Sequence, residues 1–147
     1  MQFKNITLAV VPENFCFEGY KKFFADKNLE NVTVNLVHIF EIRNFINEFS
    51  AYTYPDEEMM PKIKGQFLEM LERFGQELFG DCKAVEVKAH CLFNTDIKKG
   101  MVDFLDENKS ELVLVPTEGK HGLSGIFHSS FAQHLCQFSH CPVLVLK

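Results

Sequence analysis

Three residues near the C-terminal end of the chain have the types and spacing of a phosphate-binding loop. Gly119 lies in a stretch rich in Gly and Ser, and the hydroxyl pair Ser129 and Ser130 follows before an apolar segment of helical spacing. Free backbone N–H groups of a loop and of a helix N-terminus favour an anion. The sequence therefore predicts a phosphate or nucleotide site, with Gly119, Ser129 and Ser130 as candidate ligands.

These residues stand inside a strand–loop–helix–strand unit. The apolar run Leu112 to Val115 predicts one strand and Val143 to Leu146 predicts a second. Between them, apolar residues recur at helical spacing at Phe127, Phe131, Leu135 and Phe138. In a parallel unit of this kind the loop at the carboxyl end of the first strand opens onto the helix N-terminus, where ligands of open α/β sheets bind.

The rest of the chain alternates strands and helices in the same way. Glu41 to Pro61 breaks the alternation, lacks periodicity and predicts an irregular excursion with one short helix. Alternating strands and helices favour a parallel sheet that is covered on both faces. The predicted elements are a strand at Ile6 to Val11, a helix starting at Pro12, a strand at Val32 to Phe40, a helix at Met60 to Leu78, a strand at Val85 to Leu92, and a helix capped by Asn94 that buries Ile97, Met101, Phe104 and Leu105.

The last unit closely resembles the end of universal stress protein domains. Nucleotide-binding members of that family carry Gly, two residues, Gly, nine residues, then Gly followed by Ser or Thr. On this pattern Pro116 and Ser129 replace the first and third Gly, whereas Gly119 and Ser130 match. The resemblance implies one domain over 1–147, an α/β Rossmann-like three-layer sandwich with a five-stranded parallel sheet in the order 3-2-1-4-5 and helices on both faces. Any ligand is then expected between the loops after Val11 and Val115.

The family comparison also implies that the groups that hold a triphosphate are depleted. Val11 stands where nucleotide-binding members have an Asp, and Pro12 and Glu13 stand where a small Gly-Ser pair is usual. Pro116 has no N–H, and Ser129 adds a Cβ close to the phosphates. Together these changes remove roughly 3–5 kcal/mol, which turns a micromolar ATP site into a roughly millimolar one or weaker.

Two interpretations of the loop stay open. In the first, no cofactor is expected and the serines only cap the last helix. In the second, a weak adenine-nucleotide or small-anion switch remains, with ATP or AMP as ligand. Gly119 and Ser130 then contact phosphate, and the base is surrounded by Val10, Ile39 and Val115.

No signature of an enzyme accompanies the loop. The chain has no GxSxG elbow, and its five Cys form no CxxC pair and match no catalytic motif, so we expect reduced, mostly buried thiols and no metal site. His128, His134 and His140 recur every six residues, so successive side chains point about 120° apart on a helix and cannot converge on one ion. An enzyme related by fold, such as a nucleotide-using ligase, is the least favoured alternative.

Composition bounds the partners and the location. The net charge is −5 without a basic cluster, which argues against nucleic acid. No apolar run of 18 residues and no signal-peptide pattern occurs, so we expect a cytoplasmic protein without membrane contact. The apolar edge strand Val143, Leu144, Val145 and Leu146 predicts a homodimer, as in the resembled family. The overall expectation is a dimeric regulatory or protective module without tight ATP binding.

Overall fold

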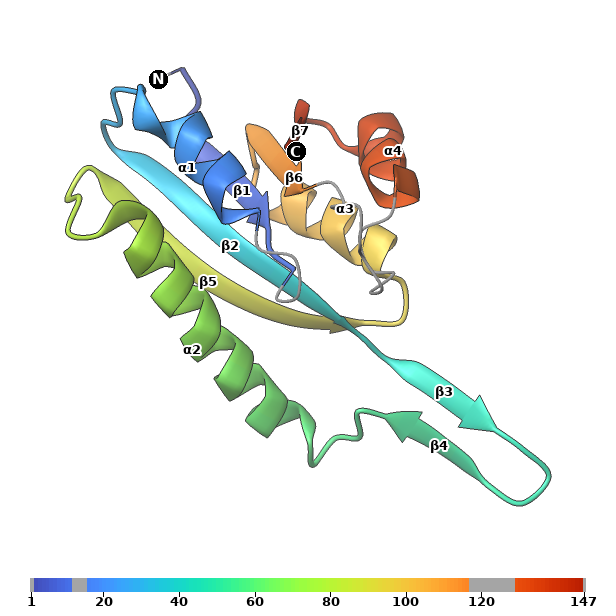
Figure 1. The fold of residues 1–147 in the computed structure, drawn as a ribbon. Coiled ribbons are helices and arrows are strands. Elements are labelled where there is room, and N and C mark those ends of the chain that lie inside the picture. The colour runs from blue at the N-terminus through green and yellow to red at the C-terminus, as the bar shows by residue number, and fades with distance from the viewer. Residues whose placement is uncertain (1, 12–15, 117–128, 147) are drawn as a thin grey trace.

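The computed structural model describes residues 2–11, 16–116 and 129–146. Figure 1 shows a sheet with helices on both sides and a hairpin that runs out beyond the body. In chain order the elements are β1 (Asn5–Ala9), α1 (Phe17–Ala25), β2 (Val32–Glu41), β3 (Arg43–Ile46), β4 (Ala51–Tyr54), α2 (Met60–Phe79), β5 (Val85–Asn94), α3 (Ile97–Glu107), β6 (Leu112–Pro116), α4 (Ser129–Phe138) and β7 (Val143–Leu146).

Five strands form a parallel sheet in the order β5-β2-β1-β6-β7. Counted among themselves along the chain, they stand in the predicted order 3-2-1-4-5. The labels differ because β3 and β4 pair only with each other, in a separate antiparallel sheet. Since β1 lies in the middle of the large sheet and is covered on both faces, its residues are apolar except for Asn5 and Thr7.

Two apolar cores cover the two faces of this sheet. On one face, Tyr20 and Phe24 of α1 and Leu71 and Phe74 of α2 pack against alternate strand residues. On the other face the core includes Met101, Phe104 and Leu105 of α3 and Phe131 and Leu135 of α4. The alternation of side chains along each strand divides the strands between these cores, which gives the predicted three-layer sandwich.

The prediction for residues 41–61 is wrong. The segment forms the β3–β4 hairpin rather than an irregular excursion, and residues 41–59, all of them described, contain no helix. The side chain of Asn47 makes the turn, because its Oδ1 accepts the backbone N–H groups of Phe49 at 2.9 Å and Ser50 at 2.8 Å. Each strand has only four residues, so the period of two was too short to recognise in the sequence.

Two smaller predictions also need correction. Asp96, not Asn94, is the N-cap of α3, and its carboxylate accepts the backbone N–H of Lys99 at 3.1 Å. Asn94 instead ends β5, which runs two residues further than predicted. Phe138 was predicted to face the core but is 60% exposed, because α4 ends there and the ring packs on His134 with centroids 4.5 Å apart.

No helix in the described part of the chain combines the length and the apolar character needed to cross a membrane.

A chain of hydrogen bonds ties three strands together on the α3 side of the sheet. Asn35 donates to Asn5 Oδ1 at 2.8 Å, and Asn5 donates to the carbonyl of Asn108 at 2.6 Å. The Oδ1 of Asn35 accepts a hydrogen bond from His90 Nε2 at 3.0 Å. Burial, followed by the charge of Lys88, lowers the pKa of His90 below its ordinary value of 6.5. Burial and the charge of Lys88 therefore favour the neutral form of this imidazole in the folded protein.

The two glycines inside α2 should respond in opposite ways to replacement by Ala. At Gly75 a Cβ would lie 2.7 Å from Val87 Cγ1 and 3.1 Å from Leu36 Cδ1, whereas at Gly65 nothing lies within 4 Å. We expect Gly65→Ala to raise the free energy of unfolding by about 0.5–1 kcal/mol through helix propensity. Gly75→Ala should lower the free energy of unfolding by about 0.5–2 kcal/mol, because overpacking against Val87 and Leu36 outweighs the gain in helix propensity. Urea unfolding of both variants tests this, and a stabilised Gly75→Ala protein would contradict it.

Stability should fall as the pH is lowered through the ordinary pKa of histidine. Because the pKa of His90 is lower in the folded protein, the unfolded chain binds more protons below about pH 6.5, and the free energy of unfolding decreases until the folded-state pKa is passed. His90→Gln keeps an N–H donor for Asn35 and should reduce the loss between pH 7.5 and pH 5. Lys88→Gln removes the positive charge that is the second cause of the lowered pKa of His90, and it should reduce this loss of stability less than His90→Gln does. Equal pH slopes for all three proteins in urea titrations would contradict this.

Candidate functional site

The carboxyl ends of β1 and β6 lie side by side where the strand order reverses. Leu8 is paired with Leu114, so the residues that follow each of them reach the same edge of the sheet. This is the position at which open α/β sheets bind their ligands. The strands that precede the two loops of the predicted site, β1 and β6, are therefore neighbours at this switch point (Figure 1), and the site itself stays a prediction.

The predicted apolar wall of the site is divided between the two cores. Val11, Ile39 and Val115 belong to the core under α3 and α4, with exposures of 4%, 0% and 1%. Val10 points to the opposite face and packs in the core under α1 and α2, with 1% exposure. The structure thus brings three of the four residues together and separates Val10 from them.

The loop residues are only partly placed. Pro116 is buried at the end of β6, opposite Leu146 of β7. Ser129 and Ser130 form the start of α4, and Ser130 is exposed. Gly119 lies outside the described residues, as do the other predicted positions Pro12, Glu13, Phe127 and His128.

The polar groups at the end of β1 are occupied by the protein itself. The hydroxyl of Tyr20 donates to the carbonyl of Ala9 at 2.6 Å, and His38 Nδ1 lies 2.9 Å from the carbonyl of Val10. The N–H of Val10 donates to the carbonyl of Val37 at 2.8 Å. A carbonyl can only accept, so His38 carries its proton on Nδ1.

The two side chains that close this end are themselves fixed. Burial is the main cause that raises the pKa of Tyr20 well above 10, so its hydroxyl remains a donor. His38 is 2% exposed and stacks on Phe67, with centroids 4.6 Å apart and planes 7° apart. His38 is therefore a core histidine. Tyr20 was missed as a functional residue, because a Tyr on an amphipathic helix gives no sign of its partner.

Other chemically active side chains form no second site. His140 bridges two segments, with Nδ1 2.6 Å from Asp106 Oδ1 and Nε2 2.8 Å from the carbonyl of Ser110. Among the residues that the structure describes, no three His, Cys, Asp or Glu side chains are grouped to hold a metal ion.

The five cysteines are all free thiols, but the expectation that most of them are buried is wrong. Only Cys91 and Cys141 are buried, whereas Cys82 and Cys136 are exposed and Cys16 is intermediate. Cys82 lies in the turn after α2 and Cys136 on the outer face of α4, where the helical stripe places polar residues. Burial raises the pKa of Cys91 to about 11, so this thiol stays protonated at neutral pH.

The predicted interface strand lies at one edge of the sheet. β7 stands last in the strand order and pairs with β6. Leu144 and Val145 are 36% and 40% exposed, while Val143 and Leu146 are half-buried. The strand therefore presents apolar side chains at an edge of the sheet.

Taken together, the described walls of the site suit apolar contact. Ala9, Val10, Val11, Val115 and Pro116 supply no charged side chain and no side-chain hydrogen bond at the carboxyl ends of β1 and β6. Polar contacts to a ligand would have to come from the loop that carries Gly119 and from the start of α4.

Solved structures with the same fold include two nucleotide complexes. The universal stress protein from Archaeoglobus fulgidus in complex with dAMP covers 100% of both chains with a TM-score of 0.62 and 19% identity. The hypothetical protein MJ0577 gives a TM-score of 0.70 with 18% identity over 99% of this chain and 96% of that one. A universal stress protein in complex with cAMP gives a TM-score of 0.58 with 11% identity, over 97% of this chain and 95% of that one. Likeness at these identities shows the fold.

Sequence comparison extends the likeness from fold to family. The chain is 32% identical to universal stress protein MJ0531 of Methanocaldococcus jannaschii over 84 residues, and this match covers 54% of the chain. The match spans about half the length of that relative, 49%. The profile of the universal stress protein family matches residues 4–147. The chain therefore belongs to the universal stress protein family.

Proposed function

We propose that this protein is a non-catalytic universal stress protein that works as a dimeric regulatory or protective module and does not bind ATP tightly. The observation that carries the proposal is the closed end of β1. There, Tyr20 and His38 occupy the carbonyls of Ala9 and Val10, and Val11 replaces the side chain that would accept a hydrogen bond from a nucleotide. A ligand at this edge meets apolar, buried side chains and gains no charged hydrogen bond from β1.

Pro116 supports the same proposal from the neighbouring strand. A phosphate-binding loop works through backbone N–H groups that point at the anion, and proline has none to give. Because Pro116 is buried and in register with Leu146, the end of β6 serves packing between the strands. Both strands that border the site thus contribute hydrophobic contacts at the positions where ligand contacts are expected.

A weak nucleotide or anion switch is the second candidate, and the dAMP and cAMP complexes of related structures favour it. In that case Gly119 and Ser130 would contact phosphate, and Val11, Ile39 and Val115, which share one core, would line the pocket beside the base. Val10 would contribute through its backbone, because its side chain packs on the other face.

Titration with nucleotides separates the two candidates. We expect isothermal calorimetry to give a roughly millimolar or weaker dissociation constant for ATP, because about 3–5 kcal/mol of contacts is absent. Val11→Asp together with Pro116→Gly should restore part of that affinity, with Val11→Asn and Pro116→Gly as the uncharged control. Saturation of the unaltered protein in the low micromolar range would refute the proposal. A measurable millimolar affinity for AMP or phosphate, in contrast, would favour the weak switch.

The dimer is proposed through β7. Its exposed Leu144 and Val145 are too apolar for a solvated edge strand, and a two-fold pairing with the same strand of a second copy would bury them.

Val145→Lys should halve the molar mass in solution, because a charged side chain at the middle of the contact would be buried without a partner. Size exclusion with light scattering measures the mass. Gln137→Lys, which adds the same charge at an exposed position of α4, is the control and should leave it unchanged. If Val145→Lys also keeps the mass of the unaltered protein, the contact lies elsewhere.

A further inference from the structure

The β3–β4 hairpin is an arm that carries most of the exposed aromatic surface of the described chain. We use "the arm" for residues 42–55. Figure 1 shows that it continues the direction of β2 away from the body. Apolar side chains on it are unusually exposed: Phe45 41%, Ile46 82%, Phe49 94%, Tyr52 56% and Tyr54 42%. Contiguous apolar surface of this kind marks an interaction site.

The arm is a defined structure rather than a loose loop. Four residue pairs form its antiparallel ladder, and Thr53 donates to Asn44 Oδ1 at 2.8 Å. Asn47 fixes the turn, so that Phe49 stands at the tip on an ordered backbone. An isolated two-stranded hairpin gains little stability in water. The described residues leave the aromatic side chains of this well-built hairpin exposed, so it is suited to be covered by another polypeptide.

One face of the arm continues the aromatic packing of the body. Cross-strand pairing puts Phe45 beside Tyr52, whose rings stack with centroids 4.9 Å apart. Tyr54, on the same face, lies 6.5 Å from Phe40, and Phe40 lies 5.7 Å from Phe67 of α2. The aromatic face of the arm therefore lies on the α2 side of the sheet.

Charge points to a protein partner. Between residues 43 and 54 the arm carries one cation and one anion, Arg43 and Glu48, and Arg43 is already 2.7 Å from Glu41. Binding to nucleic acid or to an anionic membrane draws on clustered Lys and Arg, which the arm lacks.

The same chain offers an apolar groove of matching character between α1 and α2. The groove encloses about 420 Å³, and Phe17, Met70 and Phe74 form its apolar floor. Its charged rim consists of Glu69, Arg73 and Glu77, two anions and one cation, with Arg73 paired to Glu69 at 2.7 Å. A neutral aromatic arm meets no strong repulsion there, and the volume accommodates an aromatic side chain.

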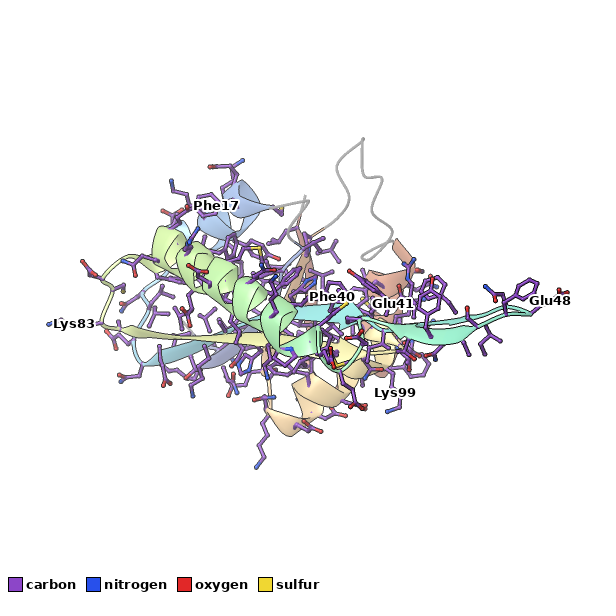
Figure 2. All side chains as sticks on the ribbon, turned by 90° about the horizontal axis from the view of Figure 1, so that it is seen from below. Phe17, Phe40, Glu41, Glu48, Lys83 and Lys99 are labelled. Atoms are coloured by element: carbon purple, nitrogen blue, oxygen red, sulfur yellow. The ribbon has the colours of Figure 1, made fainter. Side chains whose placement is uncertain are left out.

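The arm reaches the groove of a second copy but not its own. Figure 2 shows Glu48 at the far end of the arm and Phe17 on the other side of the body. From Ile42 to Glu48 an extended strand spans about 20 Å, and on α2 Met70 lies about 15 Å from the first residue, Met60. When two copies meet in a two-fold arrangement at the start of α2, each arm is long enough to lie along the partner's α2 as far as Met70.

We propose that the arm is a second self-association element, which inserts Phe49 into the α1–α2 groove of another copy while receiving that copy's arm in its own groove. The contact is isologous, since arm meets groove twice around one two-fold axis. It is separate from the β7 edge and independent of nucleotide binding. The β7 contact gives the proposed dimer, and the arm contact joins such dimers into a larger assembly.

Two variants with a matched control test the proposal by light scattering. Phe49→Asp, at a side chain with 94% exposure, cannot disturb the core and should weaken self-association about thirtyfold, as expected for an aromatic anchor. Met70→Asp in the groove should do the same, with its fold checked by circular dichroism. Phe138→Asp, which replaces an exposed Phe of α4, should leave the association unchanged. Adding Val145→Lys to Phe49→Asp should give monomers if both interfaces exist.

A photo-cross-link identifies the contact directly. Benzoylphenylalanine in place of Phe49 should link to residues around Phe17 or between Gln66 and Glu77 of a second copy, as read from the peptides of a cross-linked dimer. Links from arm to arm, or an unchanged mass for both Phe49→Asp and Met70→Asp, would overturn the proposal. Those outcomes would leave the β7 contact and the nucleotide titration unaffected.

Discussion

The burial of β1 in the middle of a parallel sheet constrains most of this structure. A strand with neighbours on both sides and helices on both faces has no access to water, so every polar group at its end must find a partner within the protein. Tyr20 and His38 meet that requirement for the carbonyls of Ala9 and Val10. Their own burial then depends on α1 and on Phe67 of α2. The site at the carboxyl edge is thus shaped by the same contacts that close the core.

The second long strand links the two surfaces of functional interest. β2 pairs with β1 over five residues and with β5 over ten, and the chain leads directly from its end into the arm. Phe40 lies at this junction, in contact with Phe67, Phe93 and Tyr54 (Figure 2). Because this cluster packs the base of the arm against α2, the hairpin is held at a fixed place relative to the sheet.

The sequence predicted the large sheet well and the local detail less well. Continuous apolar runs and helical stripes predicted the five strands and the long helix Met60–Phe79, because parallel strands buried on both faces leave a strong pattern. The order of the strands was implied by the family resemblance. The hairpin was missed because four exposed residues per strand leave almost no hydrophobic pattern in the sequence. The cap of α3 was assigned to Asn94 instead of Asp96, since both residues have side chains suited to capping and only the extent of β5 distinguishes them.

The sequence by itself determined the family resemblance, which implied the strand order, and the residue types at the candidate site: the side chain of Val11 cannot hydrogen-bond and Pro116 has no backbone N–H, whatever their surroundings. Only the tertiary structure decided which groups compensate. That Tyr20 and His38 occupy the end of β1, that Val10 turns away from Ile39 and Val115, and that aromatic residues of the arm remain uncovered follow from how distant segments pack. A hydrogen bond between residues far apart, or the exposure of a side chain, depends on that packing, and a local pattern contains no record of it.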